Sequence, residues 1–298
     1  MQKLLFTGAS GFLGTNVRPI LDRKYEIKTV GLSESDDYNV NMSNVIPELN
    51  EHYDVVLHAA GKAHIVPRTE EEKKSFFDVN YQGTVNLCKA LEKIGVPKSL
   101  IFISTVAVYG LDNGENITEE AELAGNTPYA ESKIKAEKFL IDWCKKNNVI
   151  LTVLRPSLLA GPNAPGNLGA MAKGIRTGKY LSIAGGRARK SVLMVQDIAN
   201  LVMLSADKGG IYNVCDDSQP TFRELERIIS SQLGKKLPIS IPFWTAKAMA
   251  LVGDLLGNRA PINSLKLEKI TKSNTYSNER AKKELGWKPL NVLENYNI

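Results

Sequence analysis

The feature that most constrains the fold of this chain is a glycine-rich turn near its N-terminus. Gly8, Gly11 and Gly14 follow the apolar run Lys3–Thr7 and open an apolar-periodic stretch, Phe12–Leu21. In such a strand–turn–helix unit, the first glycine permits a sharp turn, the second lets a pyrophosphate approach the backbone, and the third lets helix and strand pack closely. The N–H groups at the helix start favour an anion. We therefore predict a dinucleotide diphosphate against Gly8, Ser10, Gly11, Phe12, Leu13 and Gly14.

Short β-branched runs alternate with helical patterns over the first two-thirds of the chain. This alternation is typical of a parallel sheet that is covered on both faces. We predict the α/β class, with a Rossmann-type doubly wound parallel sheet and a smaller, mixed α/β substrate lobe toward the C-terminus. The expected strands are Lys3–Thr7, Glu26–Val30, Val55–His58, Leu100–Ser104 and Ile150–Arg155, and the expected helices are Phe12–Leu21, Phe76–Ile94 and Pro128–Asn147.

The regular alternation lapses after Pro156, where a proline- and glycine-rich loop follows at Gly161–Gly166. Such a composition is typical of a loop at a domain boundary. We predict a dinucleotide-binding domain at residues 1–160, to which 190–219 return, and a substrate-binding lobe at residues 161–189 and 220–298.

Composition and charge exclude several classes of protein. The chain of 298 residues is 43% hydrophobic and 23% charged, as is ordinary for a globular protein. The apolar stretch Trp244–Leu256 carries Lys247 and Asp254, so we predict a packed helix there and no membrane insertion. Three distant cysteines without a CxxC pair favour reduced thiols and a cytoplasmic location. The net charge is +6, but the sequence contains no nucleic-acid-binding motif, so we expect an anionic small molecule as the partner and no nucleic acid. The histidines do not lie at metal-ligand spacing, so we expect no metal site.

The end of the second expected strand bears on the choice of cofactor. An acidic residue at that place would bond the adenosine ribose and repel a 2′-phosphate. Here the strand runs into Gly31 and Ser33, while Glu34 and Asp36 come later in the chain. We therefore predict NAD(P) as the cofactor, leaning to NADP, and include Gly31 and Ser33 among the residues that bind it.

A tyrosine and a lysine lie four residues apart at a predicted helix start. Tyr129 follows Pro128, and Lys133 stacks on the same helical face. A nearby cation favours the phenolate, and lowering a tyrosine pKa from about 10 to near neutral needs about 4 kcal/mol of differential stabilisation. We expect Lys133, a positive nicotinamide and a partly dry site to supply this together, which makes Tyr129 a general acid/base. The pair follows a strand that ends at Ser104-Thr105, at the sheet edge where sites of α/β proteins lie.

Seven motifs follow one another along the chain in an order that is typical of one protein family. They are Thr7–Gly14, Leu57–Gly61, Val79–Thr84, Phe102–Gly110, the Tyr129/Lys133 pair, Leu154–Pro156 and Ala281–Pro289. Their order and spacing resemble an extended short-chain dehydrogenase/reductase of the NAD-dependent epimerase/dehydratase family over nearly the whole chain. The resemblance implies an NAD(P)-dependent oxidoreductase, a nucleotide-diphospho-sugar substrate and a homodimer. It also implies that Thr105 orients the sugar oxygen, that Tyr129 is the acid/base, and that Lys133 lowers its pKa and bonds the nicotinamide ribose.

The same resemblance assigns further residues. Asn80 would support Lys133 through a water or backbone contact, with a helix residue that caps a turn as the alternative. For His58 we expect a buried structural role. The cofactor-binding residues that it adds are Asn41, Ala59, Ala60, Gly61, Tyr129, Lys133 and Pro156. The substrate-binding residues that it implies are Thr105, Asn167, Arg189 and Lys190, and the alternative for the last two is a solvated basic loop.

Two departures from the family pattern narrow the expected reaction. The family's dehydratases carry an acidic pair directly after the catalytic threonine, whereas this chain has Val106 and Ala107, so dehydration is disfavoured. The acid that often bonds adenine is replaced by Asn41, which is polar but uncharged.

Three functions remain open from the sequence. The first, which the missing ribose acid favours, is a 4-ketoreductase of surface-polysaccharide sugar synthesis, in which Tyr129 is the acid and the nicotinamide supplies the hydride. The second is a UDP-hexose or UDP-N-acetylhexosamine 4-epimerase with tightly bound NAD, since the chemistry at Tyr129 is the same. The third, a catalytically silent NAD(P)-binding regulatory protein, is disfavoured because Thr105, Tyr129 and Lys133 are all present. The apolar segment Ile241–Leu256 either shapes the nucleotide end of the pocket or packs in a core.

Overall fold

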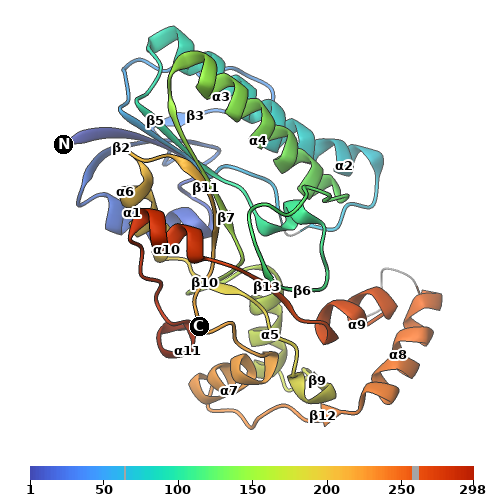
Figure 1. Cartoon of the computed structure of the whole chain (residues 1–298). Helices are drawn as coiled ribbons and strands as arrows, with labels where there is room; N and C mark the ends of the chain where they lie inside the picture. The colour runs from blue at the N-terminus through green and yellow to red at the C-terminus, as the bar shows by residue number, and fades with distance from the viewer. Residues whose placement is uncertain (64, 257–261) are drawn as a thin grey trace.

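A computed structural model describes residues 1–63, 65–256 and 262–298 and shows a twisted sheet between helices, joined to a smaller lobe (Figure 1). The sheet has seven parallel strands in the order β11-β7-β5-β4-β1-β2-β3. The order reverses between β1 and β4, which is where ligands bind in such sheets, outside the carboxyl ends of the strands. The predicted Rossmann-type fold is thereby confirmed. The strands are β1 (Gln2–Thr7), β2 (Tyr25–Gly31), β3 (Tyr38–Asn39), β4 (Val55–His58), β5 (Ser99–Ile103), β7 (Ile150–Pro156) and β11 (Gly210–Val214).

Apolar side chains of the central strands face both sides of the sheet, since successive strand residues alternate in direction. In β1, Leu4 and Phe6 pack on one side against α1 (Phe12–Leu21), α6 (Asp197–Ser205) and α10 (Glu279–Leu285), whereas Leu5 packs on the other side against α3 (Gly83–Ile94) and α4 (Pro128–Asn147). Two cores therefore hold the helices in place, and the strands read as almost continuous apolar runs.

The helix predicted at Phe76–Ile94 is divided in the structure. It consists of α2 (Glu70–Phe77), a π-helical turn (Asp78–Gln82) and α3 (Gly83–Ile94). The start lies earlier than predicted because the Thr69 hydroxyl accepts a hydrogen bond from the amide of Glu72 at 3.2 Å and caps the first turn. The widened turn brings Asn80 to the buried side of the helix.

The smaller lobe lies below the carboxyl edge of the sheet (Figure 1). A core that includes Leu168, Met171, Leu225 and Ile229 joins α5 (Gly166–Arg176) to α7 (Phe222–Gln232). Three short parallel ladders connect the lobe to the sheet domain and link its own segments. The remaining elements are β6 (Gly114–Ile117), β8 (Leu158–Ala160), β9 (Ser182–Ile183), β10 (Val192–Met194), β12 (Ser240–Ile241), β13 (Asn274–Tyr276), α8 (Phe243–Leu256), α9 (Ser264–Thr271) and α11 (Val292–Asn295), with 3-10 turns at Val106–Tyr109 and Ala184–Gly186.

The apolar stretch predicted to form a packed helix is α8, but its packing differs from the prediction. Its buried residues are the small ones, Ala246, Ala250 and Gly253, whereas Trp244 and Leu255 are exposed. None of the described helices is long and apolar enough to cross a membrane. The helix therefore contributes little to a core with its large side chains.

Candidate active site

The glycine-rich turn packs tightly at the carboxyl ends of β1 and β4. Gly8 has a φ of +78°, and a Cβ on it would lie 2.7 Å from the amide nitrogen of Ala60. A Cβ on Gly14 would lie 2.2 Å from the carbonyl oxygen of Ala9, so only glycine lets α1 approach β1 this closely. Gly11 stands at the N-cap of α1 without a capping side chain, and the first turn contains no acidic residue. These residues fit a diphosphate at the helix N-terminus.

The other predicted residues of this turn divide between solvent and the core. Ser10 is exposed, whereas Phe12 and Leu13 are partly buried and pack against the core on this side of the sheet. Any contact of Phe12 and Leu13 with the diphosphate would therefore be made through their backbone amides.

A buried polar chain fixes the backbone beside the turn. The Thr7 hydroxyl accepts a hydrogen bond from the amide of Ala60 at 3.1 Å and lies 2.7 Å from Nδ1 of His58. Nε2 of His58 lies 2.8 Å from the Thr84 hydroxyl. Burial lowers the pKa of His58 to about 3, with the Lys133 charge acting in the same direction, so the ring is neutral. As expected, this histidine has a structural place, and it holds the Ala59-Ala60 segment at the sheet edge.

A carboxylate lies at the end of β2, although no acid directly follows this strand in the sequence. A Cβ on Gly31 would lie 2.2 Å from Oδ2 of Asp36, so that carboxylate fills the space of the side chain that Gly31 lacks. The same oxygen accepts a hydrogen bond from the amide of Ser33 at 3.0 Å, and Asp36 is buried. The turn folds the chain back, which the order of residues did not predict. The structure therefore brings a carboxylate to the end of β2, and the preference for NADP stays a prediction.

Two further residues that were predicted to contact the cofactor, Asn41 and Pro156, take part in local structure. The side-chain oxygen of Asn41 accepts hydrogen bonds from the amide of Ser43 at 3.1 Å and from its hydroxyl at 2.7 Å, which closes a turn. Pro156 is the buried last residue of β7 and pairs in register with Val214. Asn41 is exposed and Pro156 ends its strand at the carboxyl edge of the sheet.

Tyr129 and Thr105 meet at the same edge of the sheet. Tyr129 lies in the first turn of α4, whose N-terminus is capped by Thr127, and Thr105 follows the end of β5, where its hydroxyl accepts a hydrogen bond from the amide of Ala107 at 3.1 Å. Burial raises the pKa of Tyr129, and the nearby Thr105 side chain opposes this rise. The direction is the reverse of the predicted lowering, because a dry site disfavours the charged phenolate, and this effect of burial exceeds what the neighbouring groups of the polypeptide contribute in the other direction.

Lys133 is buried one helical turn after Tyr129. Its Nζ donates a hydrogen bond to the carbonyl oxygen of Ile103 at 2.8 Å and lies 4.5 Å from the ring centroid of Phe102. Burial lowers the pKa of Lys133 to about 8, although the carboxylate of Glu137 acts to raise it. The ammonium is thus anchored to the last residue of β5, beside the position of Thr105.

Asn80 connects the loop after β4 to α4. Its Oδ1 accepts a hydrogen bond from the amide of Lys62 at 2.7 Å, and its Nδ2 donates one to the Ser132 hydroxyl at 2.9 Å. A Cβ on Gly61 would lie 3.0 Å from Oδ1 of Asn80 and 3.2 Å from Nζ of Lys133. Asn80 therefore holds Gly61 against the lysine through backbone contacts, and a side chain at Gly61 would press on both groups.

A buried ion pair beneath Lys133 was not predicted from the sequence. Glu137 and Arg155 have side chains that are 1% and 4% exposed, with Nη2 of Arg155 at 2.6 Å from Oε2 of Glu137. Ser104 donates a further hydrogen bond to Glu137, and Nη1 of Arg155 donates one to the Tyr109 hydroxyl at 2.9 Å. Two features of the sequence indicate this pair. Glu137 follows Lys133 by one helical turn, and Arg155 belongs to the motif Leu154–Pro156, in which no role was predicted for the arginine.

The predicted substrate residues lie in the smaller lobe and at its junction with the sheet domain. Asn167 is exposed at the second position of α5. Nη1 of Arg189 donates a hydrogen bond to the carbonyl oxygen of Gln219 at 3.0 Å. Lys190 is partly buried, and burial lowers its pKa to about 8, although Asp112 acts to raise it. The three residues are separate from the acid–base group, and their role toward a substrate stays a prediction.

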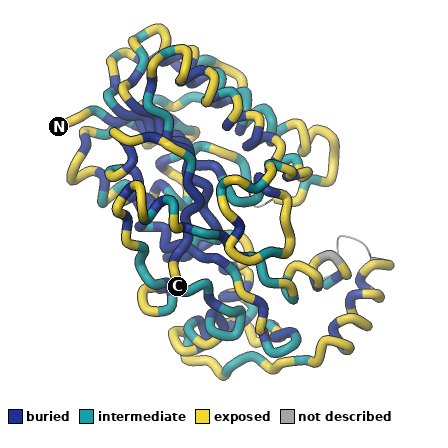
Figure 2. The backbone as a smooth tube through the Cα atoms, in the orientation of Figure 1, coloured by how far each residue is buried: buried dark blue, intermediate teal, exposed yellow. Residues whose placement is uncertain are grey.

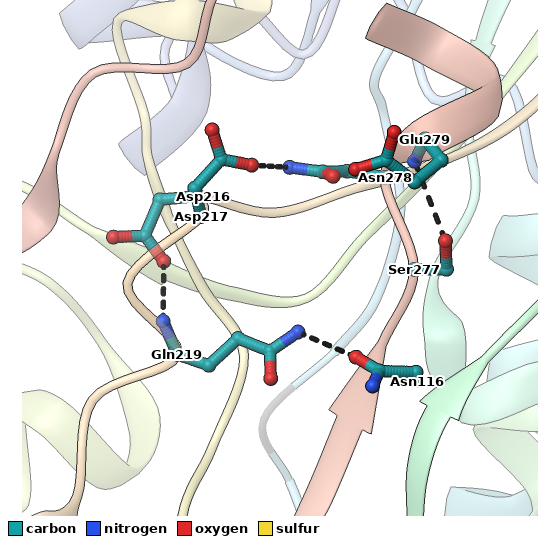
Figure 3. A pocket seen from close by; sticks show the side chains of 7 residues that line it. All are labelled: Asn116, Asp216, Asp217, Gln219, Ser277, Asn278 and Glu279. Carbon is teal, nitrogen blue, oxygen red and sulfur yellow. Dashed lines mark hydrogen bonds between the residues drawn. The ribbon is translucent and has the colours of Figure 1, made fainter.

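A polar cavity of about 370 Å³ is lined by none of the predicted site residues (Figure 3). Its carboxylates are engaged in joining chain segments: Oδ2 of Asp216 accepts a hydrogen bond from the amide of Val292 at 3.0 Å, and Oδ1 of Asp217 accepts one from Nδ2 of Asn278 at 2.8 Å. We interpret this cavity as a structural junction. Its lining residues are Asn116, Asp216, Asp217, Gln219, Ser277, Asn278 and Glu279.

Comparisons with known proteins agree with this arrangement. Residues 4–215 match the model of the NAD dependent epimerase/dehydratase family. The chain is 29% identical to an N-acetyl-α-D-glucosaminyl-diphospho-ditrans,octacis-undecaprenol 4-epimerase of Escherichia coli O157:H7, over 90% of this chain and 85% of that protein. It is 27% identical to a UDP-glucose 4-epimerase of Vibrio cholerae, over 98% of this chain and 92% of that one.

Solved structures share the fold. The structure of a UDP-glucose 4-epimerase from Thermotoga maritima with UDP-glucose superposes with a TM-score of 0.76 and 21% identity, and covers 98% of this chain and 95% of that one. The family match spans the sheet, the glycine-rich turn and the Tyr129/Lys133 pair. The chain therefore belongs to the NAD-dependent epimerase/dehydratase family and is an NAD(P)-dependent enzyme.

Proposed function

We propose that the protein oxidises and reduces C4 of a nucleotide-diphospho-sugar, with Tyr129 as the general acid/base. The observation that carries this proposal is the placement of Thr105 and Tyr129 at the carboxyl edge of the sheet, with the buried ammonium of Lys133 on the next turn of the helix after Tyr129. The relatives from Escherichia coli and Vibrio cholerae, both named as 4-epimerases of diphosphate-linked sugars, support the choice of substrate and of C4.

Each residue of this group has a distinct task in the proposed reaction. When bound, NAD(P) accepts or supplies the hydride at C4. Tyr129 takes the proton of the sugar hydroxyl during oxidation and returns a proton to the oxygen during reduction. Thr105 orients that oxygen, because its hydroxyl lies near Tyr129 at the end of β5 and can donate a hydrogen bond while it accepts one from the amide of Ala107. Lys133 stabilises the phenolate form by its charge, and Asn80 keeps the loop at Gly61 against the lysine.

Of the two reactions at C4, we favour the 4-epimerase with NAD. We take the carboxylate of Asp36, which lies beside Gly31 at the end of β2, as the acid that accepts hydrogen bonds from an adenosine ribose and repels a 2′-phosphate. In this reaction bound NAD would take up the hydride from C4 and return it to the other face of the sugar, and Tyr129 acts first as base and then as acid.

The 4-ketoreductase is the second candidate, because donation of a proton by Tyr129 to a ketone oxygen as the hydride arrives is also the chemistry of reduction alone. The sequence-based preference for NADP agrees with this candidate, because a reductase of this kind uses NADPH as the hydride donor.

The group to which the sugar is attached through the diphosphate also has two candidates. The relative from Escherichia coli is named for a sugar on diphospho-undecaprenol, whereas the one from Vibrio cholerae is named for a sugar on UDP. Both carriers present a diphosphate, for which Arg189 and Lys190 are the proposed contacts. We take the nucleoside diphosphate as the first carrier to test and the polyprenyl diphosphate as the second.

The test begins with the cofactor that the purified protein retains. Released nucleotide is identified by mass after denaturation, and the protein is then assayed with UDP-N-acetylhexosamines and with 4-keto-sugar nucleotides plus NADPH. Retained NAD with interconversion of C4 epimers supports the epimerase. Consumption of NADPH only with a keto-sugar supports the reductase. Bound cofactor without turnover of either substrate class, on either carrier, would leave the silent regulatory protein and end the proposal.

A further inference from the structure

Helix α8 exposes large apolar side chains to a degree that the rest of the described chain does not match. Among the described residues, sixteen large apolar side chains are exposed, and seven of these lie between Ile239 and Leu255. Trp244 is 74% exposed and Leu255 is 88% exposed. Figure 2 shows α8 at the margin of the smaller lobe, exposed over most of its length. Exposed apolar patches of this kind mark surfaces that contact another molecule.

Opposite faces of α8 have different roles. Ala246, Ala250 and Gly253 are buried, and the two alanines pack in a small cluster with Ile183 and Leu267. At 3.6 residues per turn, positions 244, 251 and 255 lie on the opposite face of the helix. Small residues thus hold the helix to the lobe, while Trp244, Leu251 and Leu255 form an outward stripe, which we call the α8 stripe.

The segment around α8 carries most of the net charge of the protein. Residues 235–272 contain seven Lys or Arg and two Asp or Glu, a net charge of +5 out of +6 for the whole chain. Lys247 on α8 is exposed, whereas the exposed Lys269 on α9 pairs with Asp112 at 3.3 Å. Because screening extends over about 10 Å in ordinary salt, the charge of Lys247, which belongs to the same helix as the stripe, acts on any large anionic surface that the stripe touches.

A positive apolar face suits an anionic bilayer better than a second copy of the chain. A symmetric pair of chains joined through the α8 stripe would bring two segments of +5 together, which opposes association. A bilayer with anionic headgroups attracts this charge instead, and tryptophan is enriched at the membrane–water interface. The helix has 14 residues and does not span, so it would lie in the plane of the surface.

We propose that α8 docks the protein on an anionic membrane surface, with Trp244, Leu251 and Leu255 inserted among the lipid headgroups. The proposal concerns where the enzyme works and holds for either reaction at C4. It places the smaller lobe next to the bilayer, with the sheet domain on the far side of this lobe (Figure 1).

Flotation of the full-length protein with lipid vesicles tests the proposal without any measurement of turnover. Vesicles of phosphatidylethanolamine and phosphatidylglycerol are compared with vesicles of phosphatidylcholine alone. The wild-type protein should float with the anionic vesicles, and less so at high salt. Replacing both Leu251 and Leu255 by Gln should lower the partition coefficient by about tenfold or more, since two apolar side chains no longer enter the interface.

The matched control is the double change Leu181→Gln with Leu204→Gln, which removes two exposed leucines elsewhere and should leave flotation unchanged. Equal thermal unfolding midpoints for both variants show that each one is folded. The proposal is overturned if the wild-type protein does not float, or if the α8 variant floats as well as the control. It is also overturned if light scattering shows a wild-type dimer that the α8 variant alone converts to a monomer, because the stripe then contacts a second copy.

Discussion

The carboxylate of Glu137 and the guanidinium of Arg155 form a two-point ion pair, with 2.6 Å between Nη2 and Oε2 and 3.2 Å between Nε and Oε1. The pair joins α4 to β7 directly beneath the buried Lys133. Because both side chains are almost fully buried, neither charge has water as an alternative partner. The position of the helix that carries Tyr129 and Lys133 therefore depends on this pair.

Replacing Arg155 by Ala should lower the free energy of unfolding by about 3–5 kcal/mol, because Glu137 would remain as an uncompensated buried charge. Urea denaturation measures this change. The exposed pair Lys98–Asp207 offers a control, since Lys98→Ala should change the same quantity by about 1 kcal/mol or less. Similar values for both variants would show that the buried pair has no special importance.

Replacing Tyr129 by Phe should reduce kcat by about a hundred- to ten-thousandfold, because the proton donor is lost while the ring remains. Cofactor affinity, measured by fluorescence titration, should stay within a few-fold. Tyr296→Phe, another buried phenol far along the chain, should keep its activity and serves as the control. A Tyr129→Phe enzyme with most of its activity would exclude Tyr129 as the acid/base.

Replacing Asp36 by Asn should raise the affinity for NADPH relative to NADH by about tenfold, because the negative charge is removed while an oxygen for the Ser33 amide is kept. Binding of the two reduced cofactors is measured by fluorescence. The exposed neighbour Glu34 provides the control variant Glu34→Gln. If both variants leave the ratio of affinities unchanged, Asp36 does not set the cofactor preference.

Lys133 should make stability increase with pH over a defined range. Its pKa is lowered to about 8 in the folded protein and returns to its ordinary value on unfolding, so between these two values the unfolded state binds more protons. The free energy of unfolding of the wild type, relative to Lys133→Met, should therefore rise by about 1–2 kcal/mol from about pH 8 to about pH 9.5. A constant or falling difference would mean that Lys133 is not desolvated in the folded state.

Replacing Arg189 and Lys190 together by Ala should chiefly raise the KM for the sugar nucleotide, by about tenfold or more, since charge-assisted hydrogen bonds to a diphosphate are lost. Steady-state kinetics separate this from a change in kcat. The control is Arg187→Ala, because Arg187 is exposed and its replacement also removes one positive charge from this loop. This control should leave the KM unchanged. An unchanged KM in the double variant would assign the diphosphate contact to other residues.

Local chemistry explains why the sheet and the glycine-rich turn could be predicted from the sequence. The apolar runs at Lys3–Thr7 and Val55–His58 became strands because their side chains are buried on both faces. Pro128 marked the start of α4 correctly, because proline fits the first helical turn. The predicted edges were displaced where a side chain acts as a cap, as Thr69 does for α2.

Features that depend on the chain folding back could not be predicted in the same way. Asp36 reaches the space above Gly31 through a turn, and the pattern of residues does not specify that return. The exposure of α8 was missed for a related reason, since apolarity predicts burial only when a partner surface exists in the same chain. The pKa of Tyr129 is raised by burial, and the spacing of Tyr129 and Lys133 in the sequence does not reveal how deeply the phenol is buried.

The negative charge at the end of β2 comes from Asp36, which belongs to the turn after the strand and not to the strand itself. Val30 of the strand packs in the core and tolerates little change, whereas Glu34 and Ser35, in the turn that leads to the buried Asp36, are exposed. An engineer could therefore exchange this turn to retune the electrostatic environment of the ribose while the hydrophobic framework of the domain stays the same.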